Sequence, residues 1–175
     1  ARTACARCGT GISQMEMNEG YADREDPGLT VRFPLIDRPG ESMLVWTTTP
    51  WTLPANVAAA VHPNLVYLKV RQGEDQLWVG KGAAKSALKG QFEVLEEKPG
   101  SELLGWRYQG PFDELPAVQL AFEEKDYEHR VIEWEEVTED EGTGIVHIAP
   151  GCGAEDFELS GEHDLPILTP VDESG

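Results

Sequence analysis

The sequence predicts a mainly β fold, a β-barrel-like domain with a few short peripheral helices. Short runs rich in β-branched and aromatic residues recur along most of the chain. Gly and Pro, 18 and 12 residues in total, supply turn signals between these runs. Stretches with helical periodicity are few. Together these three observations indicate a barrel or a strongly curved sheet.

The expected strands follow one another along the chain, separated by turn residues. The first, 29–33, alternates in character after a turn signal at Asp26-Pro27-Gly28. The second, 43–48, is apolar, ends in hydroxyl side chains and is stopped by Pro50 and Pro54. Further strands are expected at 57–61, 66–70, 76–79, 91–95, 117–121, 130–134 and 144–148. Short helices are expected at 82–88 and at 154–159, the latter with acidic residues in its first turn.

The domain organisation is expected to be simple. Residues 1–40 are interpreted as a connecting arm with an entry strand, and residues 41–175 as the β-barrel domain, one compact domain overall. Within the arm, Cys5 and Cys8 have the spacing of half a structural zinc site. No second pair of ligands is apparent, and Cys152 has no partner nearby. Either the chain is a fragment of a larger protein that carries the other ligands, or the motif is incidental.

Composition and charge exclude several classes of protein. Hydrophobic residues make up 40% and charged residues 26%, which is a globular balance rather than a disordered one. No apolar run approaches the ~20 residues that span a bilayer, and the start of the chain lacks a signal-peptide core. The sequence therefore predicts a soluble, cytoplasmic protein without a membrane partner. The net charge of −18 argues against tight binding to nucleic acid by this chain alone.

The first segment with chemical character is WTTTPWTLPAN, residues 46–56. Thr47, Thr48 and Thr49 place hydroxyls and backbone N–H groups around one spot at the end of a strand, and two prolines stiffen the following turn. Such donors can hold a ribose or a carbonyl oxygen and orient a water molecule. The alternative interpretation is structural, because threonine is a good strand former.

The second segment is GTGIVHIAPGCGAEDF, residues 142–157. It combines a strand that carries His147, a glycine-rich turn that lets a ligand approach the backbone, and Asp156 at the start of a helix. Asp156 can bind an ammonium group through a charge-assisted hydrogen bond, or it can simply cap the helix. A histidine on an apolar strand is more often a hydrogen-bonded core residue than a catalyst.

The remaining candidates are weaker. His62 is interpreted as a turn residue, and His129 and His163, which lie in charged stretches, as surface residues. The lysines at 81, 85 and 89 recur at helical spacing, which is typical of a solvated helix face and also compatible with a small basic stripe for nucleic-acid phosphates.

Both segments together resemble the editing domain, the connective-peptide insertion, of isoleucyl-tRNA synthetases. WTTTPWTLPAN resembles the threonine-rich motif of that family, and GTGIVHIAPGCGAEDF resembles its second motif. Valyl and leucyl relatives typically carry an arginine after two threonines, where this chain has Thr49. HDLPILTPVDESG resembles the stretch that leads out of the domain, and CARCGT resembles the first zinc knuckle of the connecting arm.

The resemblance implies post-transfer editing inside a class I synthetase, with pre-transfer editing as an additional option. The substrates would be valyl-tRNA(Ile), through its 3′ end, and valyl-adenylate, and the rest of the synthetase would be the protein partner. Isoleucine would be excluded by size, because one methylene in an apolar pocket contributes only about 1–3 kcal/mol, a general figure rather than one measured on this chain. No cofactor is implied in the editing site, and structural zinc is expected only in a full-length protein.

The resemblance also implies roles for individual residues. Asp156 would hold the α-ammonium group, while Thr47, Thr48 and Thr49 would line the catalytic subsite and position water. The substrate-binding residues would be Trp46, Trp51, Thr52, Asn56 and His147, with the tryptophans as walls and His147 bounding the side-chain pocket. No general base is apparent, so water is expected to be oriented rather than strongly activated.

Three rival interpretations remain at this stage. A non-catalytic β-barrel that binds RNA ends or amino acids would have the same fold and no turnover. An editing domain of valyl or leucyl type would differ in substrate, and Thr49 argues against it. A zinc-ribbon scaffold would bind one zinc ion per chain firmly, whereas two thiolates predict loose binding or none.

Overall fold

The computed structural model describes residues 5, 7–20 and 28–170, which fall into two units. One unit comprises residues 1–27 and 171–175, and the other runs from Gly28 to Pro170. The first unit contains helix α1, Gln14–Glu19. A capping box begins this helix: the Ser13 backbone N–H donates to Glu16 Oε2 at 2.9 Å, and the Glu16 N–H donates to Ser13 Oγ at 3.3 Å. The second unit carries the sheet and the candidate site.

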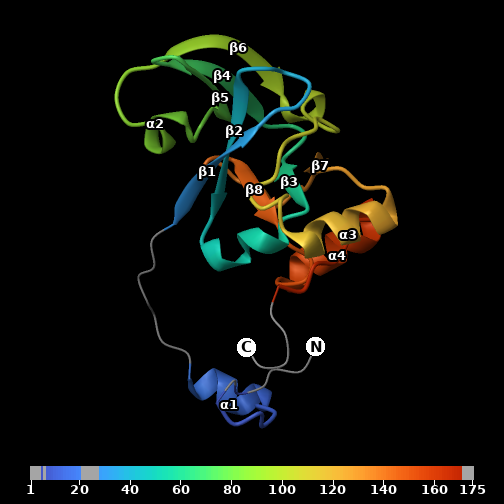
Figure 1. The fold of residues 1–175 in the computed structure, drawn as a ribbon. Coiled ribbons are helices and arrows are strands. Elements are labelled where there is room, and N and C mark those ends of the chain that lie inside the picture. The colour runs from blue at the N-terminus through green and yellow to red at the C-terminus, as the bar shows by residue number, and fades with distance from the viewer. Residues whose placement is uncertain (1–4, 6, 21–27, 171–175) are drawn as a thin grey trace. The chain divides into compact units, whose positions relative to one another are not determined.

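The unit from Gly28 to Pro170 is built on one eight-stranded sheet, curled like a half-barrel, as the sequence predicts (Figure 1). The path of paired strands is β6-β4-β5-β2-β8-β3-β7, with β1 paired to β2. The strands are β1 Leu29–Pro34, β2 Glu41–Thr47, β3 Ala58–Val61, β4 Val66–Gln72, β5 Asp75–Gly80, β6 Glu93–Pro99, β7 Arg130–Glu133 and β8 Ile145–Ile148. The helices are η1 Pro50–Ala55, α2 Ala84–Ala87, η2 Gly100–Glu102, α3 Pro116–Lys125 and α4 Ala154–His163.

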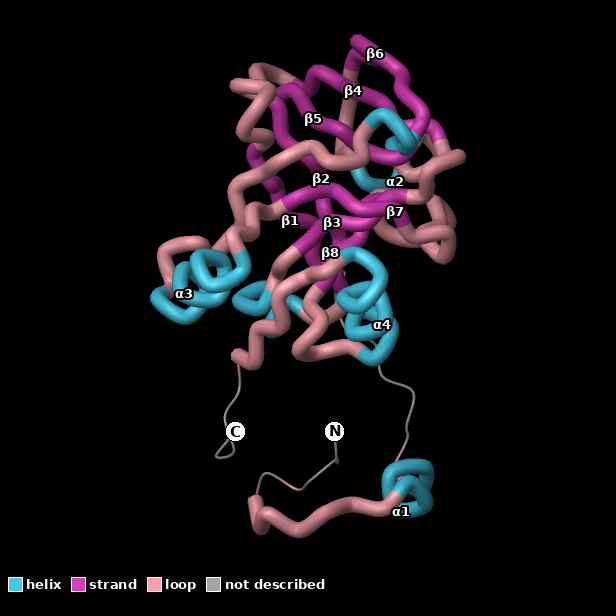
Figure 2. The backbone as a smooth tube through the Cα atoms, turned by 90° about the vertical axis from the view of Figure 1, so that its right-hand side faces the viewer, coloured by secondary structure: helices cyan, strands magenta, loops and turns pink. Residues whose placement is uncertain are grey.

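Strand β2 is the junction of the sheet. β1 pairs antiparallel with it along its length, from Leu29 opposite Thr47 to Pro34 opposite Ser42. The other edge of β2 is shared, because its first residues pair in parallel with β5 and Trp46 pairs in parallel with Val146 of β8. This branching lets the sheet curl. In Figure 2 the strands β4, β5 and β6 lie at one end of the unit, and α3 and α4 lie at the other.

Strand β3 lies in the middle of the hydrophobic core, where both of its faces are covered. Its sequence is Ala-Ala-Ala-Val, and all four residues are buried. Ala59 and Val61 pack into a cluster with Phe33, Tyr67 and Trp78, whereas the other two alanines pack into a second cluster that includes residues of α4. Alternation of side chains along the strand explains this division. Small side chains allow both layers to approach the strand closely.

One expected strand is wrong: residues 117–121 belong to helix α3. Val118, Ala121 and Phe122 face the core, a spacing of three and four that suits a helix, and Pro116 occupies the first turn, where a missing N–H costs nothing. Four of the five residues of this run are apolar, and the periodicity of so short an apolar run does not distinguish a buried strand from a helix, which is why it resembled a strand. Helix α4 extends beyond its expected end to His163. Within the described residues, no helix is long and apolar enough to cross a membrane.

Candidate functional site

The two motif segments meet at one cavity. The pairing of Trp46 with Val146 places the end of β2 beside β8, so the threonine loop and His147 become neighbours. The cavity has a volume of about 330 Å³ and is lined by η1, β8 and the start of α4 as well as the end of β2. Its lining residues are Trp46, Thr47, Thr48, Thr49, Trp51, Thr52, Val146, His147, Cys152, Gly153, Glu155 and Asp156. Eight of the nine expected catalytic and substrate-binding residues are in this set, and Asn56 is the ninth.

The threonine loop is held by its own hydroxyl groups. Thr47 Oγ1 accepts a hydrogen bond of 3.1 Å from the Thr49 backbone N–H, and it lies 3.4 Å from Thr49 Oγ1. The Thr52 hydroxyl donates to the Thr49 carbonyl at 2.8 Å and lies 3.2 Å from Thr49 Oγ1. Thr48 is exposed and lines the cavity. These bonds fix the turn and leave Thr48 turned to solvent, where a ligand can reach it.

His147 is buried, with 6% of its surface exposed, and both ring nitrogens have partners. Nε2 lies 2.9 Å from Thr52 Oγ1, and Nδ1 lies 2.8 Å from Asn56 Nδ2. Burial lowers the pKa of His147 to about 4, because desolvation disfavours the charged ring more than the contact with Thr52 favours it. The ring is therefore neutral at physiological pH. His147 is both a hydrogen-bonded core histidine and a residue that lines the cavity.

Asn56 lies behind the cavity rather than in its wall. It is 2% exposed, and its amide nitrogen donates to the Ala58 carbonyl at 2.9 Å. Its amide oxygen accepts a 2.8 Å bond from the Tyr108 hydroxyl. Asn56 therefore braces His147 from behind and does not line the cavity, where a substrate-binding residue was expected.

Asp156 occupies the third position of α4, and its carboxylate turns back to the loop before the helix. Asp156 Oδ2 accepts a 2.7 Å hydrogen bond from the Ala149 backbone N–H, and the residue at the helix N-cap, Gly153, makes no side-chain capping bond. The carboxylate therefore closes the glycine-rich loop instead of capping its own helix. Burial raises the pKa of Asp156, the Ala149 N–H opposes that rise, and the negative charge of Glu155 adds to it. Among the described residues, no cation forms an ion pair with Asp156.

The two tryptophans of the first motif lie differently. Trp46 is half-buried and packs against glycine backbone on two sides, because a Cβ at Gly28 or Gly142 would lie 2.6 or 2.5 Å from its ring. Gly142 also has a φ of +73°, which a side chain would strain. Trp51 lines the cavity with 67% of its surface exposed. Trp46 is a fixed wall, and Trp51 is an open aromatic face beside the entrance.

The interpretation of His129 as a surface residue is wrong. It is 4% exposed, its Nε2 lies 2.7 Å from Asp113 Oδ1, and its Nδ1 lies 3.0 Å from the Val57 carbonyl. The charged stretch around it in the sequence gave no sign of a buried ring, which lies on the residue just before β7. Tyr108, which stacks on His129 with ring centroids 4.9 Å apart, carried no signal in the sequence.

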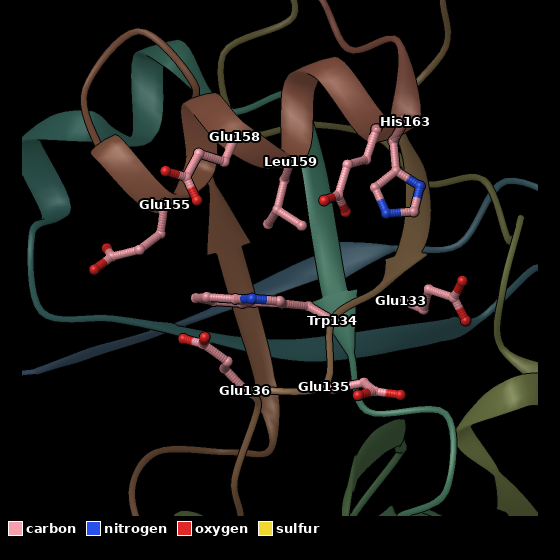
Figure 3. Close-up of a pocket in the computed structure, with 9 residues that line it drawn as sticks. Glu133, Trp134, Glu135, Glu136, Glu155, Glu158, Leu159 and His163 are labelled. Carbon is pink, nitrogen blue, oxygen red and sulfur yellow. The ribbon is translucent and has the colours of Figure 1, made fainter.

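A larger hollow, of about 600 Å³, lies along another face of α4 (Figure 3). Figure 3 shows the Trp134 ring and Leu159 near its centre, with glutamates around them. Its lining residues are Glu133, Trp134, Glu135, Glu136, Glu155, Glu158, Leu159, Glu162 and His163. All six glutamates are exposed. Apart from Glu155, it shares no residue with the cavity of the two motifs.

The cysteine pair in the first unit lies in a tight turn. The backbone N–H groups of Cys8 and Gly9 both donate to the Cys5 carbonyl, at 3.2 and 2.8 Å. The Cys8 sulfur lies 3.4 Å from the Thr10 hydroxyl, and hydrogen bonds that the Thr10 hydroxyl and backbone N–H give to the thiolate lower the pKa of Cys8. Within the part of the chain that the structure describes, no group of three or more Cys, His, Asp or Glu could hold a metal ion. The half zinc site therefore stays a prediction.

Comparisons with known proteins identify relatives over almost the whole chain, although no protein-family model matches. Isoleucine--tRNA ligase of Pyrococcus horikoshii is 42% identical over 179 residues, which cover 98% of this chain. The same ligase of Methanoregula boonei is 44% identical over 98% of this chain, and Isoleucine--tRNA ligase 2 of Bacillus cereus is 42% identical over 98%. The chain spans only 16–17% of the length of these relatives.

Solved structures agree on the fold. The editing domain of the P. knowlesi cytosolic leucyl-tRNA synthetase aligns with a TM-score of 0.62 at 13% identity, covering 83% of this chain and 66% of that one. The crystal structure of GlLeuRS-CP1 aligns with a TM-score of 0.64 at 19% identity, covering 78% of this chain and 60% of that one. At 42–44% identity over nearly its full length, this chain belongs to the isoleucine–tRNA ligase family, and its fold is that of the synthetase editing domains.

Proposed function

We propose that this chain is the editing module of an isoleucine–tRNA ligase and hydrolyses the ester of valyl-tRNA(Ile), together with valyl-adenylate. The observation that carries the proposal is the Asp156 carboxylate. It has no cation partner among the described residues, and it lines the same cavity as the threonine loop. Burial of an unpaired carboxylate costs free energy, and a ligand that brings a cation recovers that cost.

The α-ammonium group of the aminoacyl ester is such a ligand. Asp156 would hold it by a charge-assisted hydrogen bond, and Glu155 adds a second negative charge beside the cavity. The ester carbonyl and the ribose would then lie near the threonine loop, where Thr48 is exposed and the Thr47 and Thr49 hydroxyls are close by. Trp51 offers its exposed face to the terminal adenosine.

The chemistry would be direct hydrolysis. A water oxygen attacks the carbonyl carbon, the bond from that carbon to the ribose oxygen breaks, and the ribose oxygen takes up a proton from the water. His147 is a poor candidate for the proton acceptor, because both of its nitrogens already bond to protein groups and its pKa is about 4. Positioning of water and ester would therefore supply most of the rate enhancement.

Selectivity would arise from exclusion. The synthetic site of such a ligase gains only about 1–3 kcal/mol from one extra methylene, so a second site that rejects isoleucine raises fidelity. The buried His147 ring and the fixed Trp46 are the rigid walls against which the extra methylene would clash. Because the chain carries a net charge of −18, most of the affinity for tRNA would come from the rest of the ligase, in the cytoplasm.

The test compares deacylation of Val-tRNA(Ile) and Ile-tRNA(Ile) by the folded chain and by its Asp156→Ala variant. A full-length isoleucine–tRNA ligase that carries the chain is assayed in parallel, so that tRNA delivery does not limit the result. Selective loss of valine that the substitution abolishes supports editing. Binding of a non-hydrolysable valyl-adenosine analogue without turnover in either protein would replace the proposal with a non-catalytic binding module.

For the first unit, we propose that Cys5 and Cys8 supply two thiolates of a structural zinc site whose other ligands lie elsewhere in the ligase. Zinc requires four ligands in a structural site, and the turn at Cys5–Gly9 has the compact form that a pair of thiolates needs. We expect the chain alone to lose zinc to a chelator readily. Metal retained at one ion per chain would contradict this view.

A further inference from the structure

A chain of buried polar groups runs from the cavity into the core. Thr52 Oγ1 contacts His147 Nε2, His147 Nδ1 contacts Asn56 Nδ2, and Asn56 Oδ1 contacts the Tyr108 hydroxyl, with distances of 2.9, 2.8 and 2.8 Å. The Tyr108 ring lies between two others, because it stacks on Phe33 and on His129 with centroid distances of 4.9 Å each. These groups join η1, β8 and the loop before α3 in one hydrogen-bonded network.

The direction of each bond follows from a backbone carbonyl that can only accept. Asn56 Nδ2 lies 2.9 Å from the Ala58 oxygen, so the amide nitrogen, not the amide oxygen, must face that way. The amide oxygen then faces Tyr108, whose hydroxyl is the donor. The orientation of the Asn56 amide is thus set on both sides by fixed groups.

The same reasoning assigns the proton on His147. The second hydrogen of Asn56 Nδ2 has two neighbours, His147 Nδ1 at 2.8 Å and the Ile148 carbonyl at 3.5 Å. The shorter contact is the stronger hydrogen bond, so Nδ1 accepts and carries no proton. The neutral ring therefore has its proton on Nε2, which donates to Thr52 Oγ1. Thr52 in turn donates to the Thr49 carbonyl at 2.8 Å. The donor and the acceptor of each hydrogen bond between Tyr108 and the threonine loop are thereby assigned.

We propose that Tyr108 is a positioning residue, which acts through Asn56 to hold His147 in its neutral Nε2–H tautomer. The role of this tautomer in the site rests on the proposed editing function. A protonated His147 would place a second N–H donor against Asn56 Nδ2 and a positive charge in the cavity that receives an ammonium group. A neutral ring with a fixed donor instead holds Thr52 and the threonine turn in one arrangement.

The other charged groups near the network are accounted for. Asp156 and Glu155 of α4 line the same cavity as His147. On the far side, Asp113 contacts Nε2 of His129 at 2.7 Å, and this pair supports the stacked Tyr108 ring rather than touching His147. The burial of Tyr108 raises its pKa well above the usual value, so its hydroxyl stays protonated and remains a donor.

The direct test is nitrogen-15 NMR of the histidine side chains in the intact chain. Long-range correlation spectra distinguish a protonated ring nitrogen from a bare one, and His147→Gln assigns the signals among the 4 histidines. We expect His147 to show a protonated Nε2 and a bare Nδ1 at neutral pH. A protonated Nδ1 would overturn the proposal whether or not the chain edits, since the spectrum needs no turnover.

A matched pair of variants then tests Tyr108 itself. Tyr108→Phe removes only the hydroxyl that holds the Asn56 amide oxygen and leaves the Ala58 carbonyl to orient the amide by itself, so we expect the Nδ1–H form of His147 to become populated. Tyr127→Phe is the control, because its buried hydroxyl donates to the Val57 carbonyl at 3.1 Å and does not contact Asn56. Loss of either hydroxyl costs a similar amount of folding free energy. An unchanged His147 spectrum in Tyr108→Phe, or an equal change in both variants, would refute the role.

Activity separates the inference from the function on which it rests. In the full-length ligase, we expect Tyr108→Phe to lower valine-selective deacylation roughly tenfold and Tyr127→Phe to leave it within about twofold, as one hydrogen bond is worth about a factor of ten. If the wild-type ligase does not edit but His147 has the expected tautomer, the proposed function fails and the assignment of the tautomer stands. If the wild-type ligase edits and Tyr108→Phe edits equally well, the positioning role fails.

Discussion

Two hollows meet at the start of α4, and they differ in almost every respect except that Glu155 lines both. The larger has about 600 Å³ and six glutamates, all exposed. The smaller has about 330 Å³, and its central acid, Asp156, is half-buried and bonded to the Ala149 N–H. A count of carboxylates would select the larger hollow, whereas the smaller one has the fixed groups.

The difference lies in how firmly each hollow is built. Exposed glutamates remain in contact with water and can turn away from a ligand, so their charge is screened. In the smaller cavity the threonine loop, His147 and Asp156 are each fixed by at least one hydrogen bond of 3.1 Å or less. Preorganised groups of this kind do not have to reorder when a ligand arrives. Volume and charge are therefore weaker guides to a site than fixed partners are.

The largest expected effect is the loss of editing in Asp156→Asn. The amide keeps an oxygen for the Ala149 N–H, but it removes the charge that would hold the α-ammonium group. Loss of one partner from a partly buried charge pair costs about 2–5 kcal/mol, which is more than a 30-fold decrease in valine-selective deacylation. Glu158→Gln removes one charge from the larger hollow and should change the rate less than about twofold. Equal effects of the two substitutions would erase the distinction between the hollows.

The second effect is the acid sensitivity that buried His147 imposes on the fold. Its pKa is about 4 in the folded chain and about 6.5 when exposed, so the unfolded chain binds more protons between these values. The contribution of His147 to the free energy of unfolding is fully present above pH 6.5. It is lost as the pH drops toward 4, by roughly 3 kcal/mol in total. Urea unfolding from pH 7 to pH 4 measures this slope.

His147→Gln should flatten that slope, because the titrating ring is gone. The matched variant His163→Gln removes the histidine of the larger hollow, which is only partly buried and lines an open surface. If the free energy of unfolding depends on pH as in the wild type in His163→Gln but not in His147→Gln, the acid sensitivity belongs to the smaller cavity and not to the larger hollow. A slope that survives the loss of His147 would show that other groups dominate.

The third and smaller effect is a gain in stability from Asp156→Asn, the same substitution that is expected to remove editing activity. Burial raises the pKa of Asp156, so its carboxylate is a cost to the fold at neutral pH. A group of this kind stabilises the fold below the pKa of the unfolded chain, about pH 4, and that contribution is lost as pH rises through the folded pKa. Asp156→Asn should therefore raise the melting temperature at pH 7 by a few degrees at most, while it removes activity. A lower melting temperature in calorimetry would contradict this trade of stability for function.

The sequence predicted most strands, for physical reasons that can be stated. Threonines at the end of a strand and an acid after a glycine-rich turn are local patterns, and residues of both segments, including Thr47 and Asp156, line one cavity. Their roles in binding and hydrolysis stay predictions. Residues 117–121 were misassigned because a short, mostly apolar run has no clear periodicity of its own. The helix becomes apparent only when Pro116 and Phe122, on either side of the run, are included.

The groups behind the site could not be predicted in this way. Tyr108 and Asn56 are 52 residues apart and meet only after the sheet has curled. His129 lies in a charged stretch and is nevertheless buried, because its ring, just before β7, contacts Asp113 and stacks on Tyr108. Long-range polar contacts leave no periodic trace in a sequence, so the network that orients His147 requires coordinates.

The smallest effect uses the cysteines as reporters of the smaller cavity. Burial and the nearby charge of Asp156 raise the pKa of Cys152, while the contact with Thr10 lowers the pKa of Cys8. Because the thiolate is the reactive form, iodoacetamide at pH 7.5 should modify Cys8 before Cys152 in chelator-treated protein, as measured by mass spectrometry of the tryptic peptides. Asp156→Asn should speed the alkylation of Cys152 and leave Cys8 unchanged, whereas Glu158→Gln should alter neither rate. Faster alkylation of Cys152 in Glu158→Gln would mean that the charges of the larger hollow reach into the cavity, and that the two hollows are one electrostatic region.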